Sequence, residues 1–290
     1  MSNMSSNSIR LLDGRMLGYL ECGDPEGKPV FYFHGFPGSR REVQFSHKTA
    51  SQQNIRMIGI DRPGYGISGY KKNRTILDWP DDVTQLADAL GIDNFSVLGV
   101  SGGGPYATAC AYKIPRRLIS VGIACGLGPI TGTGVVKDML WFNHFGLIIA
   151  AHVPWLVSLI MTPIAFLLRH HADKIVGHLS RSSKEPDRSA LNQPEIISIM
   201  SDTFKESVRH GAAGAARDAV LYANPWGFNL PKIRLRVHLW HGEKDTIVPV
   251  SMGRLMADTI SNCRASFYKT EGHFSLLINC MADILGTLVA

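Results

Sequence analysis

The chain has few cysteines, and no two of them stand close together. No Cys-x-x-Cys pair occurs, so neither a disulfide framework nor a cysteine-based zinc site is expected. Free thiols in a reducing compartment are the simplest interpretation, and they favour a cytoplasmic protein without a metal. The five cysteines are Cys22, Cys110, Cys125, Cys263 and Cys280.

Long runs of basic residues are also missing. The formal net charge is +6, but the longest basic clusters are pairs such as Arg40-Arg41 and Arg116-Arg117. This scatter indicates a solvated basic surface, so no nucleic-acid partner is expected. Residues 1–8 are polar and lack the apolar stretch of a secretory signal, so we expect them to form a frayed tail.

Charged side chains are absent from one long segment. Between Met139 and Leu168 there is no Asp, Glu, Lys or Arg, and a run of this length could cross a bilayer. Two histidines, His144 and His152, and two prolines, Pro154 and Pro163, divide the segment. We therefore expect two shorter helices that line an apolar pocket. A segment that lies in a membrane surface without crossing it is the alternative.

The remaining pattern predicts an α/β fold. Hydrophobic residues make up 45% of the 290 residues and charged residues 19%, which is enough for a large core. Short apolar strands alternate with helical segments, the pattern of a mostly parallel sheet with helices on both faces. Eight strands are expected, at residues 9–12, 16–21, 30–33, 55–60, 95–100, 118–124, 235–240 and 265–268, with helices at 78–90 and 274–288.

The alternation of strands and helices stops between residues 129 and 223. This stretch reads as several helices interrupted by prolines, without a convincing strand. An inserted all-helical cap over the carboxyl edge of the sheet explains it, because open α/β sheets bind ligands at that edge. The expected division is therefore a core of residues 1–128 and 224–290, with a cap of residues 129–223.

A candidate nucleophile follows the strand expected at 95–100. The sequence Gly99-Val100-Ser101-Gly102-Gly103 has the small neighbours that a serine needs on a sharp turn between a strand and a helix. A serine hydroxyl also needs a base, a group that orients the base, and donors for the oxyanion.

Each of these partners has a candidate directly after an expected strand. His273, in Glu271-Gly272-His273-Phe274, is the candidate base, and Asp245 is the candidate orienting acid. Glu243 is the rival acid. Asp245 is preferred because its loop continues into Val248-Pro249, which reads as the start of a helix.

The candidate oxyanion donors are backbone amides. One belongs to Gly102, directly after the serine, and the other to Phe36 in the loop His34-Gly35-Phe36-Pro37-Gly38. Pro37 has no amide hydrogen and cannot donate. His34 is interpreted as a structural hydrogen-bonding residue at the base of this loop.

The order serine, aspartate, histidine, with a helical insert before the acid, resembles the α/β-hydrolase superfamily and its helical-cap branch. The loop at 34–38, the loop Asp61-Arg62-Pro63-Gly64-Tyr65-Gly66 and the elbow around Ser101 each match patterns of that branch. The resemblance covers roughly residues 9–128 and 224–288. It implies acyl transfer to water without a cofactor. A serine at the elbow argues against epoxide hydrolase and haloalkane dehalogenase activity, because those relatives use aspartate there.

The leading hypothesis is a serine hydrolase that cleaves a small or medium carboxylic ester with an apolar portion. Thioesterase, lactonase and carbon–carbon hydrolase activities share the same triad and stay open. Two alternatives differ in kind: a weakly catalytic or non-catalytic receptor for a small ligand on the same fold, and a lipid hydrolase at a membrane surface.

Overall fold

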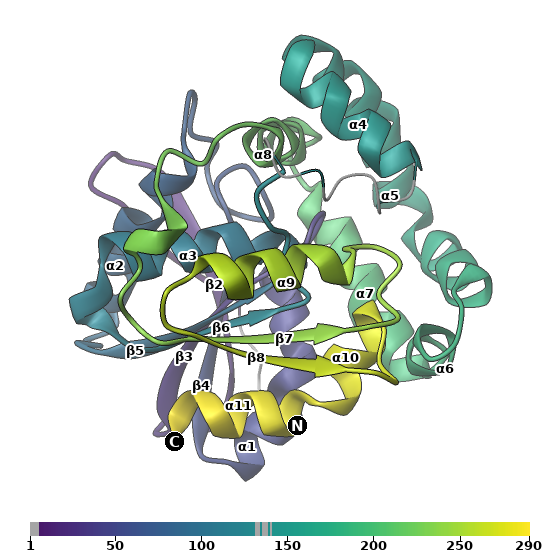
Figure 1. Cartoon of the computed structure of the whole chain (residues 1–290). Coiled ribbons are helices and arrows are strands. Elements are labelled where there is room, and N and C mark those ends of the chain that lie inside the picture. Colours follow the sequence, from purple (N-terminus) through teal and green to yellow (C-terminus); the bar gives the residue numbers. More distant parts are fainter. Residues whose placement is uncertain (1–5, 131–133, 135–138, 140) are drawn as a thin grey trace.

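Eight strands form one sheet in the order β1-β2-β4-β3-β5-β6-β7-β8 (Figure 1). The computed structural model describes residues 6–130, 134, 139 and 141–290, without the side chains of 141–143. The pairs β1–β2 and β2–β4 are antiparallel, and all other neighbours are parallel. The strands are β1 (Ser6–Arg10), β2 (Met16–Gly23), β3 (Lys28–Phe33), β4 (Ile55–Ile60), β5 (Phe95–Val100), β6 (Leu118–Ala124), β7 (Val237–Gly242) and β8 (Cys263–Tyr268).

Helices cover both faces of the sheet, as the sequence predicts. The strands of its centre are apolar on both sides, and every residue of β5 is buried. Helices α2, α3 and α9 pack on one face, and α1, α10 and α11 on the other (Figure 1). These helices are α1 (His47–Gln52), α2 (Trp79–Ala89), α3 (Gly104–Lys113), α9 (Val250–Thr259), α10 (His273–Asn279) and α11 (Met281–Val289).

Three local expectations are wrong. The first strand begins at Ser6, where Ser6 pairs with Leu20, so residues 6–8 belong to the sheet and not to a frayed tail. The single helix expected at 274–288 is two helices, because the backbone at Cys280 (φ −109°, ψ 9°) leaves the helical range. The strand expected at 235–240 begins two residues later, at Val237. Residues 1–5 lie outside the described part.

Within residues 141–223 the structure describes helices and no strand. Pro154 and Pro194 begin helices, where their missing N–H groups cost nothing. A further expectation is wrong: Pro163 does not divide the uncharged segment, because it lies inside the helix that begins at Pro154. The helices are α4 (Trp141–His152), α5 (Pro154–Ser182), α6 (Asp187–Leu191), α7 (Pro194–Ser207) and α8 (Ala213–Ala223). Parts of the expected cap, at 131–133, 135–138 and 140, lie outside the described residues, so its boundaries at 129 and 223 stay a prediction.

A buried carboxylate joins this helical segment to the core. Asp218 of α8 is fully buried between two buried arginines, and its Oδ2 lies 2.8 Å from Arg62 Nε, while Oδ1 accepts from Arg74. Burial raises the pKa of Asp218, but the charges of Arg74 and Arg62 more than offset this and hold its pKa well below the ordinary value. The hydroxyl groups of Tyr65, Tyr106 and Tyr222 also contact this carboxylate.

Arg62 extends the same cluster to the loop after β3. Its guanidinium donates to the carbonyl oxygens of His34 and Gly35, and the Arg62 amide contacts the ring of His34. One carboxylate on α8 therefore neutralises the arginine that fixes the backbone of residues 34–35. A buried ion pair of this kind contributes little net stability when intact, but the loss of one partner leaves a charge buried alone.

We predict that Asp218→Asn lowers the free energy of unfolding by about 3–5 kcal/mol, because two arginines would remain buried without a counter-charge. Chemical denaturation measures the change. Asp173→Asn is the matched control, since Asp173 is exposed and its ion pair with Lys205 lies at the surface. Its effect should stay within about 0.5 kcal/mol. Equal small losses for both variants would contradict this account of the cluster.

Candidate active site

Ser101 occupies a strained turn at the carboxyl end of β5. Its φ of +52° lies in the left-handed region, which is uncommon for a residue with a side chain. A single 3-10 turn, Ser101–Gly103, leads directly into α3. A Cβ atom on Gly99 would lie 2.5 Å from the Gly103 carbonyl oxygen, and one on Gly103 would lie 2.1 Å from that of Phe33. The turn can therefore form only with glycine at both positions, as the sequence predicts.

His273 and Asp245 are joined by a short hydrogen bond. The imidazole Nδ1 donates to Asp245 Oδ2 over 2.7 Å, and both side chains are buried. Asp245 follows β7, and its Oδ1 accepts the amides of Ile247 and Val248, each at 2.8 Å. Glu243, the rival acid, pairs instead with Arg254 on the surface. The structure therefore brings together the acid and base that the sequence analysis preferred.

Each member of this pair shifts the pKa of the other. Burial raises the pKa of Asp245, but the imidazoles of His273 and His241 together more than offset it, so the net pKa lies well below the ordinary value. Burial lowers the pKa of His273, whereas the Asp245 carboxylate raises it, and the net pKa lies above 6.5. Asp245 is thus a carboxylate at neutral pH, and it stabilises a proton on His273.

Ser101 and His273 lie at the same edge of the sheet, and Glu42 lies near both. Strand register places the ends of β5, β6 and β7 side by side, with Val100 beside Ala124 and Ala124 beside Trp240. A Cβ atom on Gly35 would lie 3.6 Å from Ser101 Cβ and 3.5 Å from Glu42 Oε2. The charge of Glu42 in turn raises the pKa of His273. No hydrogen bond joins the Ser101 hydroxyl to the His273 imidazole in this structure.

The backbone at Phe36 and Gly102 forms the other side of this site. A Cβ atom on Gly102 would lie 2.8 Å from both Phe36 Cβ and the Tyr222 hydroxyl, so the two candidate donors are neighbours. Gly102 is the second residue of a helical turn, where an amide has no partner within the helix. Within the described part of the chain, the Phe36 amide donates to no backbone carbonyl. The Tyr222 hydroxyl lies 2.8 Å from the Gly102 carbonyl oxygen.

Asp187 supports the backbone at His273, a role that the sequence analysis did not predict. This buried residue of α6 accepts the amides of His273, Phe274 and Ser275, at 3.0, 3.0 and 2.9 Å. A carboxylate at the start of α10 satisfies amides that the helix leaves free and complements its dipole. The residue lies 86 positions before His273 in the chain, so no local pattern could reveal the contact.

Glu42 is a second support that the sequence did not reveal. Its buried carboxylate accepts the Gly35 amide at 2.9 Å and the Tyr32 hydroxyl at 2.9 Å. Burial raises its pKa above the ordinary value, although these hydrogen bonds lower it. The sequence places Glu42 only among polar residues after the 34–38 loop, where nothing marks it as buried.

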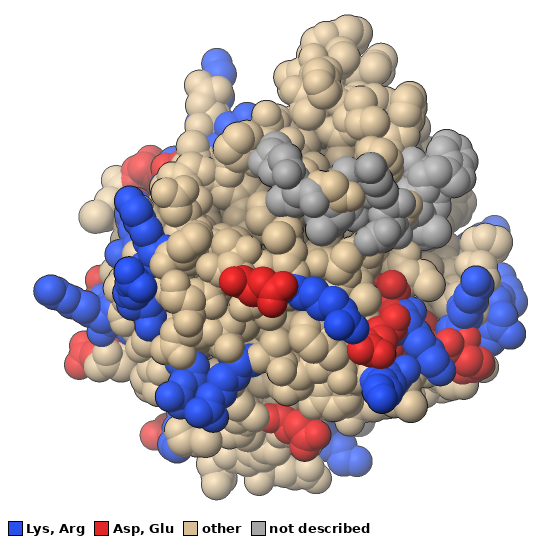
Figure 2. All heavy atoms as spheres, viewed as in Figure 1, with Lys and Arg blue, Asp and Glu red and all other residues tan. Residues whose placement is uncertain are grey.

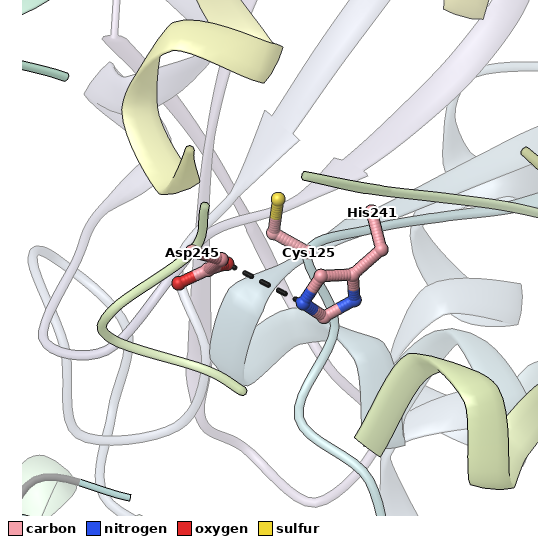
Figure 3. A group of neighbouring side chains, drawn as sticks. All are labelled: Cys125, His241 and Asp245. Carbon is pink, nitrogen blue, oxygen red and sulfur yellow. Dashed lines mark ion pairs between the residues drawn. The ribbon is translucent and has the colours of Figure 1, made fainter. Parts of the chain in front are cut away.

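Cys125, His241 and Asp245 form a buried cluster whose ligand-type atoms lie within 4.8 Å of one another (Figure 3). Hydrogen bonds already engage most of these atoms. His241 Nε2 contacts the Val248 carbonyl oxygen at 2.9 Å, and Asp245 Oδ2 is bound to His273. Burial also raises the pKa of the Cys125 thiol well above its ordinary value, which favours the protonated form. His241 Nε2 also lies 3.4 Å from Asp245 Oδ2, so the cluster helps to hold Asp245 in place.

An apolar cavity of about 340 Å³ opens directly above Ser101. Helices α4, α5 and α8 form its roof. Its lining, among the described residues, contains no charged side chain. The lining residues are Phe36, Ser101, Gly102, Leu127, Met139, Gly146, Leu147, Ile149, Val157, Ile160, Met161, Ile164, Ala219, Tyr222, Ile247 and Val248. This matches the apolar pocket expected from the uncharged segment.

Curated relatives match one part of the chain. A proline iminopeptidase from Xylella fastidiosa is 34% identical over 108 residues, which are 36% of this chain and 34% of the relative. The acetyltransferase component of an acetoin cleaving system from Pseudomonas putida is 32% identical over 116 residues, 40% of this chain and 31% of the relative. The chain thus spans about a third of the length of these relatives.

Solved structures match the whole fold. A hydrolase from Pseudomonas aeruginosa PA01 superposes with a TM-score of 0.71 and 18% identity, over 100% of this chain and 99% of that one. An esterase from Exiguobacterium antarcticum gives a TM-score of 0.67 and 18% identity, over 98% of both chains. An enol-lactonase from Burkholderia xenovorans gives a TM-score of 0.68 and 18% identity, again over 98% of both.

The family model of the alpha/beta hydrolase fold matches residues 28–279, which is most of the chain. The strand order, the helices on both faces and the helical insert before β7 agree with that match. The chain therefore belongs to the α/β-hydrolase fold family.

Proposed function

We propose that the protein is a serine hydrolase that cleaves carboxylic esters with an apolar acyl or alcohol portion. The observation that carries the proposal is the buried His273–Asp245 hydrogen bond at the sheet edge where Ser101 occupies its left-handed turn. A base with a raised pKa, an ionised partner and a serine beneath an apolar cavity are the groups that acyl transfer requires.

In the proposed reaction, His273 takes the proton of the Ser101 hydroxyl while the oxygen attacks the ester carbonyl carbon. The Asp245 carboxylate stabilises the imidazolium that forms. His273 then gives the proton to the leaving alcohol as the bond between the carbonyl carbon and the alcohol oxygen breaks. This step leaves an acyl group on Ser101. A water molecule repeats the sequence and releases the carboxylic acid. Hydrogen bonds in substrate-free sites are often long, so the serine–histidine contact is expected to shorten when substrate binds.

The negative charge of the tetrahedral intermediate would be stabilised by the amides of Phe36 and Gly102. Both lie at the floor of the cavity, and Gly102 is at the positive end of the turn that leads into α3. Arg62 binds the carbonyl oxygen of Gly35 and Glu42 binds its amide. These two contacts hold the loop that contains Phe36 in place. The reaction in this form needs no cofactor.

The lining of the cavity favours an ester over a peptide with a free amino terminus. Such an amine is a cation and would need a carboxylate within reach, and the described lining has none. Two of the structural neighbours are named an esterase and an enol-lactonase. Their names indicate ester and lactone substrates, which supports an ester substrate for this protein.

Replacement of the candidate nucleophile gives the simplest test. We predict that Ser101→Ala lowers hydrolysis of p-nitrophenyl esters by at least roughly 10³-fold, because no attacking oxygen remains. Rates across acyl chains from acetate to palmitate would also define the substrate range. Ser51→Ala, an exposed serine on α1 at the other face of the sheet, should keep full activity. Near-normal hydrolysis by folded Ser101→Ala would exclude the mechanism.

The raised pKa of His273 predicts a particular pH dependence. Because His273 must be neutral to accept a proton, kcat/KM should fall on acidification, with a midpoint above pH 6.5. Asp245→Asn removes the charge that raises this pKa, so the midpoint should move to lower pH. The plateau rate should also fall, by roughly 10³- to 10⁴-fold.

Glu243→Gln is the matched control for the pH experiment, since this surface carboxylate lies two residues from Asp245. Both the midpoint and the plateau should match the unmodified protein. An unshifted midpoint in Asp245→Asn, or a shift of equal size in both variants, would show that Asp245 does not set the pKa of His273.

A further inference from the structure

Helices α4 and α5 expose a large apolar surface. Of the eleven large hydrophobic side chains exposed in the described part of the chain, eight belong to these two helices. They are Phe145, Ile148, Trp155, Leu159, Ile160, Ile164, Phe166 and Leu167, and we call them the cap face. Trp155 is 71% exposed and Leu159 65%. An apolar surface of this extent on a folded chain marks a binding surface.

The geometry of the two helices suits a position along a membrane surface. By length and composition α5 could cross a bilayer, and 22% of its most apolar stretch is buried. However, the helix is broken at His171 (φ −134°, ψ 23°), and Val153 (φ −133°, ψ 60°) separates it from α4. The uncharged part, residues 154–168, spans only about 22 Å at ~1.5 Å per residue, less than the ~30 Å of a hydrocarbon core.

The charges around the cap face favour an anionic surface. No Asp, Glu, Lys or Arg occurs from Met139 to Leu168, and the lobe that contains α4 shows none in Figure 2. The first charged residue that follows is Arg169, and Lys174 is next among the cations; both are exposed. Asp173 lies between them but is paired with Lys205 at 2.9 Å. The charged residues that follow the cap face along α5 are thus cationic on balance.

The cap face is continuous with the cavity above Ser101. Ile160 and Ile164 belong to both, because each is about 40% exposed and also lines the cavity. Val157 and Met161, on the same helix, line the cavity further in. An apolar molecule held against the cap face could therefore reach the cavity along α5 without leaving an apolar environment.

We propose that the cap face docks on an anionic lipid surface, from which amphiphilic esters enter the cavity. The docking itself stands on the exposed helices and their charges, whereas the supply of substrate rests on the proposed function. A second copy of the chain fits the cap face less well than a lipid surface does. A two-fold interface would bring like charges together, and it would close both cavity mouths against each other.

Vesicle flotation tests the proposal. The intact protein is mixed with phosphatidylcholine vesicles, with or without phosphatidylglycerol, and the fraction that floats is measured. We expect flotation with the anionic vesicles. The double variant Trp155→Glu/Leu159→Glu should bind them roughly tenfold or more weakly, because two apolar side chains become charged. Neither residue lines the cavity, so hydrolysis of soluble p-nitrophenyl butyrate should be unchanged, which also shows that the variant is folded.

Leu12→Glu/Ile119→Glu is the matched control, because it adds the same charges at exposed apolar residues outside the helical insert. It should float like the unmodified protein, and so should Ser101→Ala. Flotation of Ser101→Ala without hydrolysis separates docking from catalysis. The proposal is overturned if the unmodified protein stays soluble with both vesicle types, or if the Trp155/Leu159 variant floats equally well. It is also overturned if light scattering shows a dimer that this variant dissociates while no flotation occurs.

Discussion

The left-handed backbone at Ser101 is the constraint on which the rest of the site depends. It turns the chain sharply from β5 into α3 and lifts one hydroxyl above the sheet edge. The turn requires glycine at 99 and 103, and it brings the Gly102 amide beside the Phe36 loop. Strain of this kind persists only where the surrounding structure holds it, and here the buried strands around β5 supply that support.

Three buried carboxylates hold the backbone around this turn. Glu42 binds the Gly35 amide, Asp218 neutralises the arginine that binds the Gly35 carbonyl oxygen, and Asp187 binds the amides at the start of α10. Two of the three, Asp187 and Asp218, come from the helical segment between β6 and β7. That segment therefore does more than line a cavity, because its own side chains hold His273 and the backbone of residues 34–35 in place.

The sheet, the helical insert and the turn at Ser101 could be predicted from the sequence, because local patterns of apolar residues and glycine indicate each of them. Asp245 and His273 were also recognisable, since each follows a strand. Asp187, Glu42 and Asp218 were not, because a buried carboxylate looks like any surface acid until its distant amide or arginine partners are known. The break at Cys280 was missed because no proline or glycine stands at it, so nothing local separates α10 from α11.

Labelling with a fluorophosphonate probe tests the central claim most directly, because the probe forms a stable adduct only with an activated serine. The account predicts one adduct on the folded protein, mapped by peptide mass spectrometry to Ser101, and much slower labelling in His273→Ala. A folded protein that stays unlabelled, or an adduct formed at another serine, would contradict the claim that Ser101, His273 and Asp245 act as one unit.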